Sequence, residues 1–344
     1  MEKRLEIRHD PNITVIGAGA WGTSIVLLLA RKHYKVKLWA NTQDLYEDLK
    51  THRENITYFP GYPLPNEVAI EFDPLTAVYG ADILISAVPG KYLRNAARMF
   101  VPYLENTIEV LSVSKGIEPV TSYTMSQVLA EEWKIDESRI AVLSGPNFAA
   151  EVAKQMPTAS VIASKNPDLA LRLQEIFSSD TYRAYTSDDV LGVEIGSILK
   201  NIVAIGAGII EGLGFGDNTK SALIVRGLEE IRRLYMAIGA KEATLRGLAC
   251  LGDMIATSTS NLSRNKSFGL LLGKGLTPEQ ASDKISGTGK VIEGLDSLVG
   301  LLKLAERFEV RLPIAEEIMG IVNSQTTASE AIRRLMKRDL KSES

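Results

Sequence analysis

One lysine stands alone in a long apolar segment. Between Ile195 and Ile210 the only charged residue is Lys200, which Asn201 follows directly. An ammonium group in an apolar helix costs free energy unless it is paired, reaches solvent or has a chemical task. Apolar surroundings lower the pKa of a lysine toward a range useful for proton transfer. Lys200 is therefore a candidate acid–base residue, and a lysine that extends to solvent is the alternative.

Histidine and cysteine are scarce in this chain. His9, His33 and His52 all lie near the amino terminus, and Cys250 is the only cysteine. We therefore expect no metal cofactor and, in the carboxyl half, no zinc site and no histidine base. Proton transfer there falls to Lys, Asp, Glu or Tyr. A single cysteine forms no intramolecular disulfide, which favours a reducing, cytoplasmic compartment.

A second polar cluster occupies residues 250–269. Asp253 and Thr257 are four residues apart and would share one helix face. The run Ser263-Arg264-Asn265-Lys266 then stands just before another predicted helix. Hydroxyl, guanidinium, amide and helix N–H groups together form a receptor for a phosphate. A capped helix start with a solvated basic run is the alternative.

A glycine-rich turn near the amino terminus indicates a nucleotide site. A β-branched strand at 12–16 leads into Gly17, Gly19 and Gly22, then an apolar helix and a second strand at 36–40. This order is typical of a dinucleotide-binding βαβ unit. Gly17 would allow the tight turn, Gly19 the approach of the pyrophosphate, and Gly22 the close packing of helix on strand. A purely structural turn is the alternative.

The residue after the second strand leaves the choice of dinucleotide open. An acid at this position accepts the ribose hydroxyls of NAD, and an arginine accommodates the extra phosphate of NADP. Asn41 is neither. The sequence therefore allows NAD or NADP.

Further apolar runs predict the sheet that positions these residues. They are separated by helix-length segments and are apolar on both faces, which is typical of a parallel sheet covered by helices on each side. Ligands bind at the carboxyl ends of such strands, so we expect Pro89, Lys115 and the loop 144–152 beside the cofactor. The runs lie at 82–88, 108–114, 140–145 and 159–164.

From about residue 190 strand signals end and helices follow. The chain is thus predicted to form a doubly wound α/β (Rossmann) domain at 1–190 and an all-α, substrate-binding and catalytic domain at 191–344. The predicted helices lie at 190–212, 219–238, 241–257, 263–273, 278–284, 289–308 and 313–322.

Composition excludes some classes of partner. The chain has 344 residues, 24% of them charged, with a net charge of −3. This balance gives no reason to expect nucleic acid or an anionic membrane as a partner. The uncharged stretch 13–30 contains the glycine turn, so a strand, a turn and a buried helix are expected there rather than a membrane span.

With these features in place, the chain resembles the bacterial-type NAD(P)-dependent glycerol-3-phosphate dehydrogenases. The resemblance implies a helical domain like that of 6-phosphogluconate dehydrogenase and a homodimer. It also implies reversible hydride transfer from NAD(P)H to dihydroxyacetone phosphate, giving sn-glycerol 3-phosphate for glycerophospholipid synthesis. Cys250 and Asn41 depart from the family pattern, where glycine and a basic residue are more usual. Seven motifs carry the resemblance: GAGAWGT (17–23), YFPGYPLP (58–65), SVSKGIE (112–118), LSGPNFAAEV (143–152), EIGSILKNIVAIGAGI (194–209), GDMIATSTSNLSRN (252–265) and KVIEG (290–294).

The resemblance also implies a role for each matching position. Lys200 would be the proton donor and acceptor, supported by Asn201 and Asp253. The implied substrate-binding residues are Lys115, Gly145, Asn147, Lys200, Asp253, Thr257, Ser263, Arg264 and Asn265. The implied cofactor-binding residues are Gly17, Gly19, Ala20, Trp21, Gly22, Asn41, Lys115, Ala149, Arg264, Val291 and Glu293.

Two other functions fit parts of the sequence. Hydroxy-acid dehydrogenases, such as the 3-hydroxyisobutyrate and 6-phosphogluconate enzymes, share the outline but place a lysine and an asparagine four apart on a helix. Here Lys200 and Asn201 are adjacent and residue 204 is alanine. A non-catalytic nucleotide sensor would be expected to lose the proton donor or the anion site, and this chain keeps candidates for both.

Overall fold

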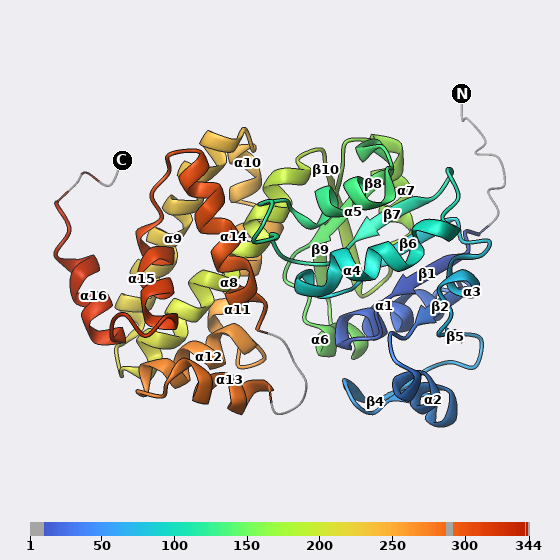
Figure 1. Ribbon diagram of the computed structural model, residues 1–344, viewed down its shortest axis with the longest axis horizontal. Helices are drawn as coiled ribbons and strands as arrows, with labels where there is room; N and C mark the ends of the chain where they lie inside the picture. The colour runs from blue at the N-terminus through green and yellow to red at the C-terminus, as the bar shows by residue number, and fades with distance from the viewer. Residues whose placement is uncertain (1–9, 287–291, 341, 343–344) are drawn as a thin grey trace.

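An eight-stranded sheet with its helices forms one half of the protein, and a group of helices forms the other (Figure 1). The computed structural model describes residues 10–286, 292–340 and 342. The strand order is β10-β9-β8-β7-β6-β1-β2-β5. After β10 ends at Ser187, helices are the only elements among the described residues, from α8 onward. The predicted fold class, a Rossmann-like α/β sheet followed by an all-helical domain, is confirmed.

The strands of the main sheet are β1 (Ile13–Ile16), β2 (Val36–Trp39), β5 (Ala69–Glu71), β6 (Ile83–Ser86), β7 (Glu109–Ser112), β8 (Ile140–Ser144), β9 (Thr158–Ser164) and β10 (Tyr182–Ser187). The helices of this half are α1 (Ala20–Arg31), α2 (Gln43–His52), α3 (Pro74–Val78), α4 (Gly90–Phe100), α5 (Met125–Trp133), α6 (Ala149–Ala153) and α7 (Pro167–Phe177). The helical half contains α8 (Val190–Gly212), α9 (Asp217–Ile238), α10 (Glu242–Leu245), α11 (Asp253–Thr259), α12 (Arg264–Gly273), α13 (Pro278–Ser286), α14 (Glu293–Arg307), α15 (Pro313–Val322) and α16 (Ala328–Met336).

Both faces of the sheet are buried, which explains why its strands read as continuous apolar runs. On β6, Ile83 and Ile85 belong to one hydrophobic core and Leu84 to the other. The first core includes Leu29 of α1, and the second includes Phe100 of α4. The glycine turn therefore follows an interior strand, β1, of a sheet that is covered on both faces.

One expectation about the sheet is wrong. The strand predicted at 159–164 was expected to run parallel to its neighbours, but β9 pairs antiparallel with β8. The only helix in the β8–β9 connection is α6, which has five residues and rises about 7.5 Å. It is too short to carry the chain back along a strand, so β9 reverses direction. The 11-residue α7 then makes a normal crossover, and β10 is parallel to β9.

The helix α8 is the centre of the helical half. Its bounds, Val190–Gly212, are those predicted from the sequence. Of the described helices it is the one long and apolar enough to cross a membrane, yet its whole apolar window is buried inside the protein. Residues 13–30, where no span was expected, form β1, the turn and most of α1. The apolar character of α8 therefore belongs to a core helix.

Glycines let α12 lie directly against α8. A Cβ on Gly208 would be 2.0 Å from the carbonyl oxygen of Lys266, and a Cβ on Gly269 would be 1.9 Å from that of Ile205. The contacts advance in the same direction along both helices, from Ile205 with Gly269 to Gly212 with Gly273. The beginning of α12 therefore lies toward the part of α8 that carries Lys200.

Several predicted helices differ from the observed ones. The single helix expected at 241–257 is divided into α10, a five-residue π-helical turn η3 (Leu248–Gly252) and α11, because Gly247 and Gly252 bound the apolar run. Of the helix expected at 289–308, α14 begins at Glu293, and 289–291 lie outside the described residues. The helix expected at 219–238 begins two residues earlier, at Asp217.

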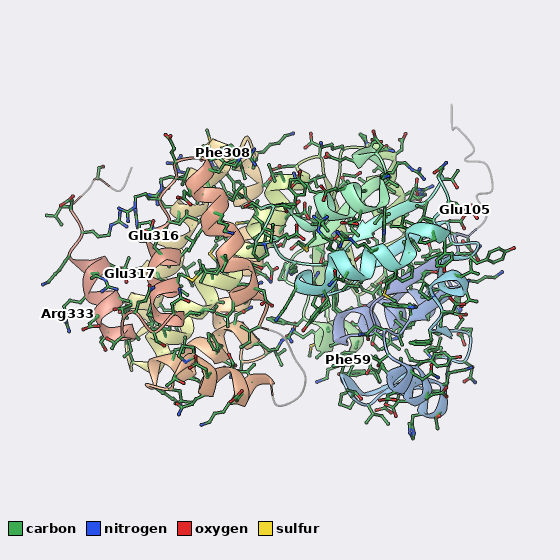
Figure 2. All side chains as sticks on the ribbon, viewed as in Figure 1. Phe59, Glu105, Phe308, Glu316, Glu317 and Arg333 are labelled. Carbon is green, nitrogen blue, oxygen red and sulfur yellow. The ribbon has the colours of Figure 1, made fainter. Side chains whose placement is uncertain are left out.

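Other elements were not predicted. They are β5, β10, α16 and the antiparallel hairpin of β3 (Glu54–Asn55) and β4 (Phe59–Pro63). The Thr327 and Glu330 capping box is the signal that would have indicated α16. An ion pair between Arg334 and Glu317 joins this helix to α15. Figure 2 labels Glu317 on α15.

Candidate active site

The ammonium group of Lys200 is buried at the centre of the protein. The residue is 6% exposed, so its side chain does not extend to solvent. Its Nζ lies 2.6 Å from Oδ2 of Asp253 and 3.2 Å from Oγ1 of Thr257. The buried charge is thus compensated by a carboxylate and a hydroxyl on α11, as the cost of burying it requires.

The local fold of α11 aims Asp253 at this lysine. The π-helical turn η3 ends at Gly252, and Asp253 is the first residue of α11. Single π turns inside helical segments are frequent at functional sites because they reorient side chains. One turn further on, Oγ1 of Thr257 donates to Oδ1 of Asp253 over 3.2 Å. The shared helix face predicted for these two residues is confirmed.

Lys115 reaches the same carboxylate from the sheet. It follows β7 by three residues, and its Nζ lies 3.0 Å from Oδ2 of Asp253. Two ammonium groups therefore contact one carboxylate, and all three side chains are largely buried. The cluster carries one excess positive charge, which favours the binding of an anion or of an oxygen that becomes negative.

This environment changes the pKa values of Lys200 on α8 and Asp253 on α11. Burial lowers the pKa of Lys200 to about 8, with Asp253 acting in the opposite direction and Lys115 in the same direction as burial. Burial raises the pKa of Asp253, but the two lysines outweigh it and hold that pKa below its ordinary value. Asp253 is thus ionised, and Lys200 can both donate and accept a proton near neutral pH.

Asn201 has a buried amide nitrogen that finds no hydrogen-bond partner among the described residues. The residue is 3% exposed, and its Nδ2 donates to no group among the described residues. A buried unpaired donor costs about 1–3 kcal/mol. Next to Lys200, such a donor fits a bound polar molecule that would accept its hydrogen bond.

The predicted substrate loop lies between β8 and α6. Gly145 has a φ of +149°, and a Cβ there would be 2.9 Å from Cα of Ser160, so glycine is required. Nδ2 of Asn147 donates to Oγ of Ser160 over 3.0 Å, and the hydroxyl of Tyr182 reaches the same oxygen over 2.7 Å. Asn147 is therefore fixed by strands β9 and β10.

The four residues of the predicted phosphate-binding cluster, 263–266, lie at the start of α12 but have different surroundings. Oγ of Ser263 caps the helix by accepting from the N–H of Lys266, and Oδ1 of Asn265 accepts from the N–H of Gly294. Lys266 is turned away, because its Nζ pairs with Glu211 at 3.1 Å. Arg264 is exposed at the first position of the helix and forms no ion pair with another described residue.

The glycine turn has the geometry that a dinucleotide needs. Gly17 has a φ of +112°, and a Cβ on Gly22 would be 2.0 Å from the oxygen of Gly17. Gly19 caps α1 without a side-chain hydrogen bond, and a Cβ there would meet nothing within 4 Å. The start of this 12-residue helix thus has open space beside Gly19, which fits a pyrophosphate bound at the helix amino terminus.

The other predicted cofactor residues lie in different settings. Ala20 and Trp21 open α1, and Asn41 is exposed just after β2. Ala149 begins α6, and its carbonyl oxygen accepts from the hydroxyl of Ser24. Val291 lies outside the described residues, and Glu293 is the first residue of α14.

Sequence reasoning missed one buried carboxylate on the helix that carries Lys200. Glu194 of α8 accepts from the N–H and the hydroxyl of Ser126, over 2.9 and 2.6 Å, at the start of α5. It joins α8 to the sheet half. Its place in the same motif as Lys200 and its charge in an apolar run were the available signals.

Comparison with known proteins gives matches over nearly the whole chain. Residues 12–170 match the family described as NAD-dependent glycerol-3-phosphate dehydrogenase N-terminus, and residues 189–333 match its C-terminus. The chain is 41% identical over 332 residues to glycerol-3-phosphate dehydrogenase [NAD(P)+] of Corynebacterium aurimucosum, covering 96% of this chain and 99% of that protein. It is 40% identical to the protein of the same name from Fusobacterium nucleatum, covering 96% and 98%.

A solved structure supports the same family assignment. The crystal structure of glycerol-3-phosphate dehydrogenase from Coxiella burnetii matches with a TM-score of 0.91 and 35% identity, covering 96% of this chain and 99% of that one. Fold and site together define an oxidoreductase that uses a nicotinamide dinucleotide and has a helical second domain. Within that class, the chain belongs to the NAD-dependent glycerol-3-phosphate dehydrogenase family. The hydroxy-acid dehydrogenase and the non-catalytic sensor are set aside.

Proposed function

We propose that this chain interconverts dihydroxyacetone phosphate and sn-glycerol 3-phosphate with NAD(P)H and NAD(P)⁺, and that Lys200 is its proton donor and acceptor. The observation that carries the assignment of Lys200 is the buried cluster in which its ammonium contacts Asp253, with Lys115 on the same carboxylate. Reduction of a ketone requires a proton at the carbonyl oxygen, and this cluster holds one with a pKa near neutral.

The residues of the chain act on the substrate in a defined order. When bound, the nicotinamide dinucleotide supplies the hydride that reduces the carbonyl carbon. Lys200 donates its proton to the carbonyl oxygen, which otherwise would carry a negative charge in a buried site. Asp253 holds the ammonium in place, and Lys115 adds positive charge beside the same oxygen. Lys200 is then neutral and takes a proton from water, and every step runs in reverse for the oxidation.

The substrate is held at the start of α12, and the dinucleotide is held at the start of α1. Arg264, at the start of α12 with Ser263 and Asn265, binds the phosphate of the substrate and supplies binding energy that orients the ketone. The Nδ2 of Asn201 donates to the substrate, since it has no partner among the described residues. The turn from Gly17 to Gly22 holds the pyrophosphate of the dinucleotide at α1.

The finer biological setting is part of the same proposal. The sheet domain spans 1–190 and the helical, substrate-binding domain spans 191–344, with the boundary at the start of α8. The protein acts in the cytoplasm as a homodimer and supplies glycerol 3-phosphate for glycerophospholipids. Its one cysteine, Cys250, is free and buried, which agrees with a reducing compartment.

The test is loss of nicotinamide absorbance with dihydroxyacetone phosphate, in parallel reactions with NADH and NADPH. We expect oxidation of at least one of the two, and their ratio gives the preference that Asn41 leaves open. Dihydroxyacetone without the phosphate is the matched control and should react far more slowly, because the anion contacts are lost. Folded protein that binds the dinucleotide but oxidises neither with the phosphorylated ketone would overturn the proposal.

A further inference from the structure

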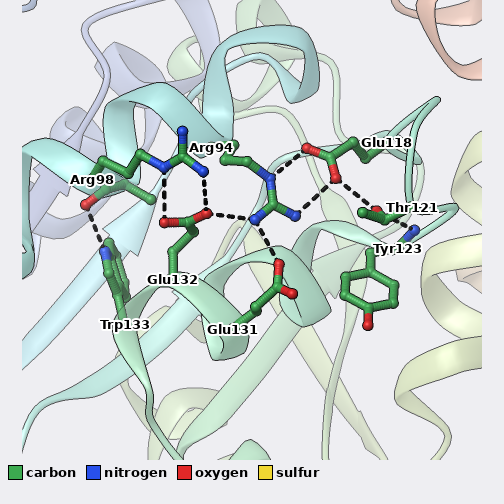
Figure 3. A network of polar contacts seen from close by, with 9 residues as sticks. Arg94, Arg98, Glu118, Thr121, Tyr123, Glu131, Glu132 and Trp133 are labelled. Carbon is green, nitrogen blue, oxygen red and sulfur yellow. Dashed lines mark hydrogen bonds and ion pairs between the residues drawn. The ribbon is translucent and has the colours of Figure 1, made fainter.

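An arginine outside the active site is surrounded by three carboxylates. Figure 3 shows Arg94 of α4 between Glu118 on one side and Glu131 and Glu132 of α5 on the other. Its Nε and one terminal nitrogen donate to the two oxygens of Glu118 over 2.6 and 2.8 Å. Such a bidentate pair fixes both the distance and the orientation of the carboxylate.

Glu118 belongs to the segment that begins with Lys115. This segment, residues 115–118, leaves the sheet after β7 and precedes α5. Thr121 donates to the same Glu118 carboxylate over 2.6 Å, and Ile117 forms an isolated bridge with Thr124. The carboxylate therefore ties the segment both to α4 and to its own following turn.

The helical domain holds the other side of the same segment. Ile117 is buried in the core of the helical domain rather than in either core of the sheet domain. A Cβ on Gly300 of α14 would be 2.9 Å from the oxygen of Ile117, and Lys303 donates to the oxygen of Pro119 over 2.8 Å. Residues 115–118 are thus pressed against α14 and restrained from the side of α4 by Arg94.

We propose that Arg94 is a positioning residue of the active site: by gripping Glu118 it fixes the segment 115–118, so that the ammonium of Lys115 stays on Asp253. The proposal rests on the function proposed above for Lys115. Gly116 stands between Lys115 and Ile117 with a φ of +151°, so the backbone there has the freedom of glycine. Without the anchor three residues after Lys115, that freedom would let the ammonium move away from the reacting ketone.

Two variants distinguish a positioning role of Arg94 from an effect of its charge at long range. Arg94→Gln removes a positive charge, and Glu118→Gln removes a negative one. If Arg94 acted only through its electric field on the anionic substrate, the two variants would change activity in opposite directions. If it acts by holding the segment, both break the same bidentate pair and both reduce activity.

The experiment compares these two variants with Arg98→Gln. Arg98 lies one turn further along α4, is more exposed and pairs with Glu132 only, so it matches the change in residue type and charge. We expect Arg94→Gln and Glu118→Gln each to lower kcat/KM for dihydroxyacetone phosphate by about tenfold. The Kd for the dinucleotide should stay the same, and Arg98→Gln should retain wild-type kinetics. Opposite effects of the two variants, or a lower melting temperature with unchanged kcat/KM, would overturn the proposal.

A double variant tests the route through Lys115. In a Lys115→Ala background, Arg94→Gln should cause no further loss, because the group it positions is gone. A full additional tenfold loss would show that Arg94 acts elsewhere. If Lys115→Ala alone has wild-type kinetics, the proposal for Arg94 fails while the reaction itself stands. If Arg94→Gln does not fold, Glu118→Gln carries both comparisons.

Discussion

The Nζ of Lys200 and the Nζ of Lys115 contact the same carboxylate oxygen, Oδ2 of Asp253, at 2.6 and 3.0 Å. Lys200 comes from the core helix α8, and Lys115 comes from the segment that follows the interior strand β7. The active-site charge is therefore assembled across both halves of the protein. Because one carboxylate cannot neutralise two ammonium groups, the cluster keeps one excess positive charge when both lysines are protonated.

Lys200→Ala should remove the proposed proton donor. We expect kcat for the reduction of dihydroxyacetone phosphate to fall by roughly 10²–10⁴, the usual range for loss of a general acid. Lys115 still pairs with Asp253 in this variant, so the buried carboxylate is not left alone and the protein should fold. Stopped-flow and steady-state rates at saturating substrate, with the Kd for NADH as the control for folding, measure the effect. A kcat within threefold of wild type would remove Lys200 from the mechanism.

The two directions of the reaction should depend oppositely on pH. Burial lowers the pKa of Lys200 to about 8. Reduction of the ketone needs the ammonium form, so its kcat/KM should fall as pH rises above about 8. Oxidation of glycerol 3-phosphate needs the neutral amine, so its kcat/KM should fall as pH decreases below about 8. Profiles between about pH 7 and 10 avoid titration of the substrate phosphate, whose second pKa is about 6.

Asp253→Asn tests the cause of that pH dependence. The carboxylate is the main group that raises the pKa of Lys200, whereas burial and Lys115 lower it. Its loss should therefore move the inflection of both profiles to lower pH, in addition to reducing activity. An inflection at the wild-type pH would mean that another group titrates.

Sequence patterns predicted those elements of the fold that depend on a single segment of the chain. The turn from Gly17 to Gly22 needs only its own strand and helix, and α8 was found because a single apolar run, 190–212, forms a core helix. The direction of β9 could not be predicted in this way. An apolar run reads the same whether the strand is parallel or antiparallel, and the short α6 connection decides.

In the site too, features encoded within one segment could be predicted, and contacts between distant segments could not. The four-residue spacing of Asp253 and Thr257 predicted a shared face, and the structure has it. No pattern in the sequence indicates that Lys115 reaches Asp253, 138 residues away. Lys266 shows the reverse case: its place beside Arg264 favoured a phosphate contact, but the pairing with Glu211 directs it elsewhere. Such contacts depend on how helices pack, which the local sequence does not record.

Gly269→Ala should disturb the packing of α12 on α8. The new Cβ would be 1.9 Å from the backbone oxygen of Ile205, so the helices must separate. We expect a loss of about 1–3 kcal/mol in the free energy of unfolding, as for other overpacked sites, and a raised KM for the phosphorylated ketone because the start of α12 moves. Gly216→Ala is the control, since a Cβ there meets nothing within 4 Å. Equal stability of the two variants in a urea titration would contradict the close approach.

Arg264→Ala should act mainly on substrate binding. The residue is exposed at the first position of α12 and forms no ion pair with another described residue, so its removal leaves no buried charge unpaired. A charge-assisted contact to phosphate contributes about 1.5–3 kcal/mol, which predicts an increase in KM for dihydroxyacetone phosphate of roughly 10- to 150-fold. Dihydroxyacetone lacks the phosphate, so its slow turnover should be the same in both proteins. Unchanged KM and kcat for the phosphorylated ketone would place the phosphate site elsewhere, and an equal loss with both ketones would assign Arg264 to the dinucleotide instead.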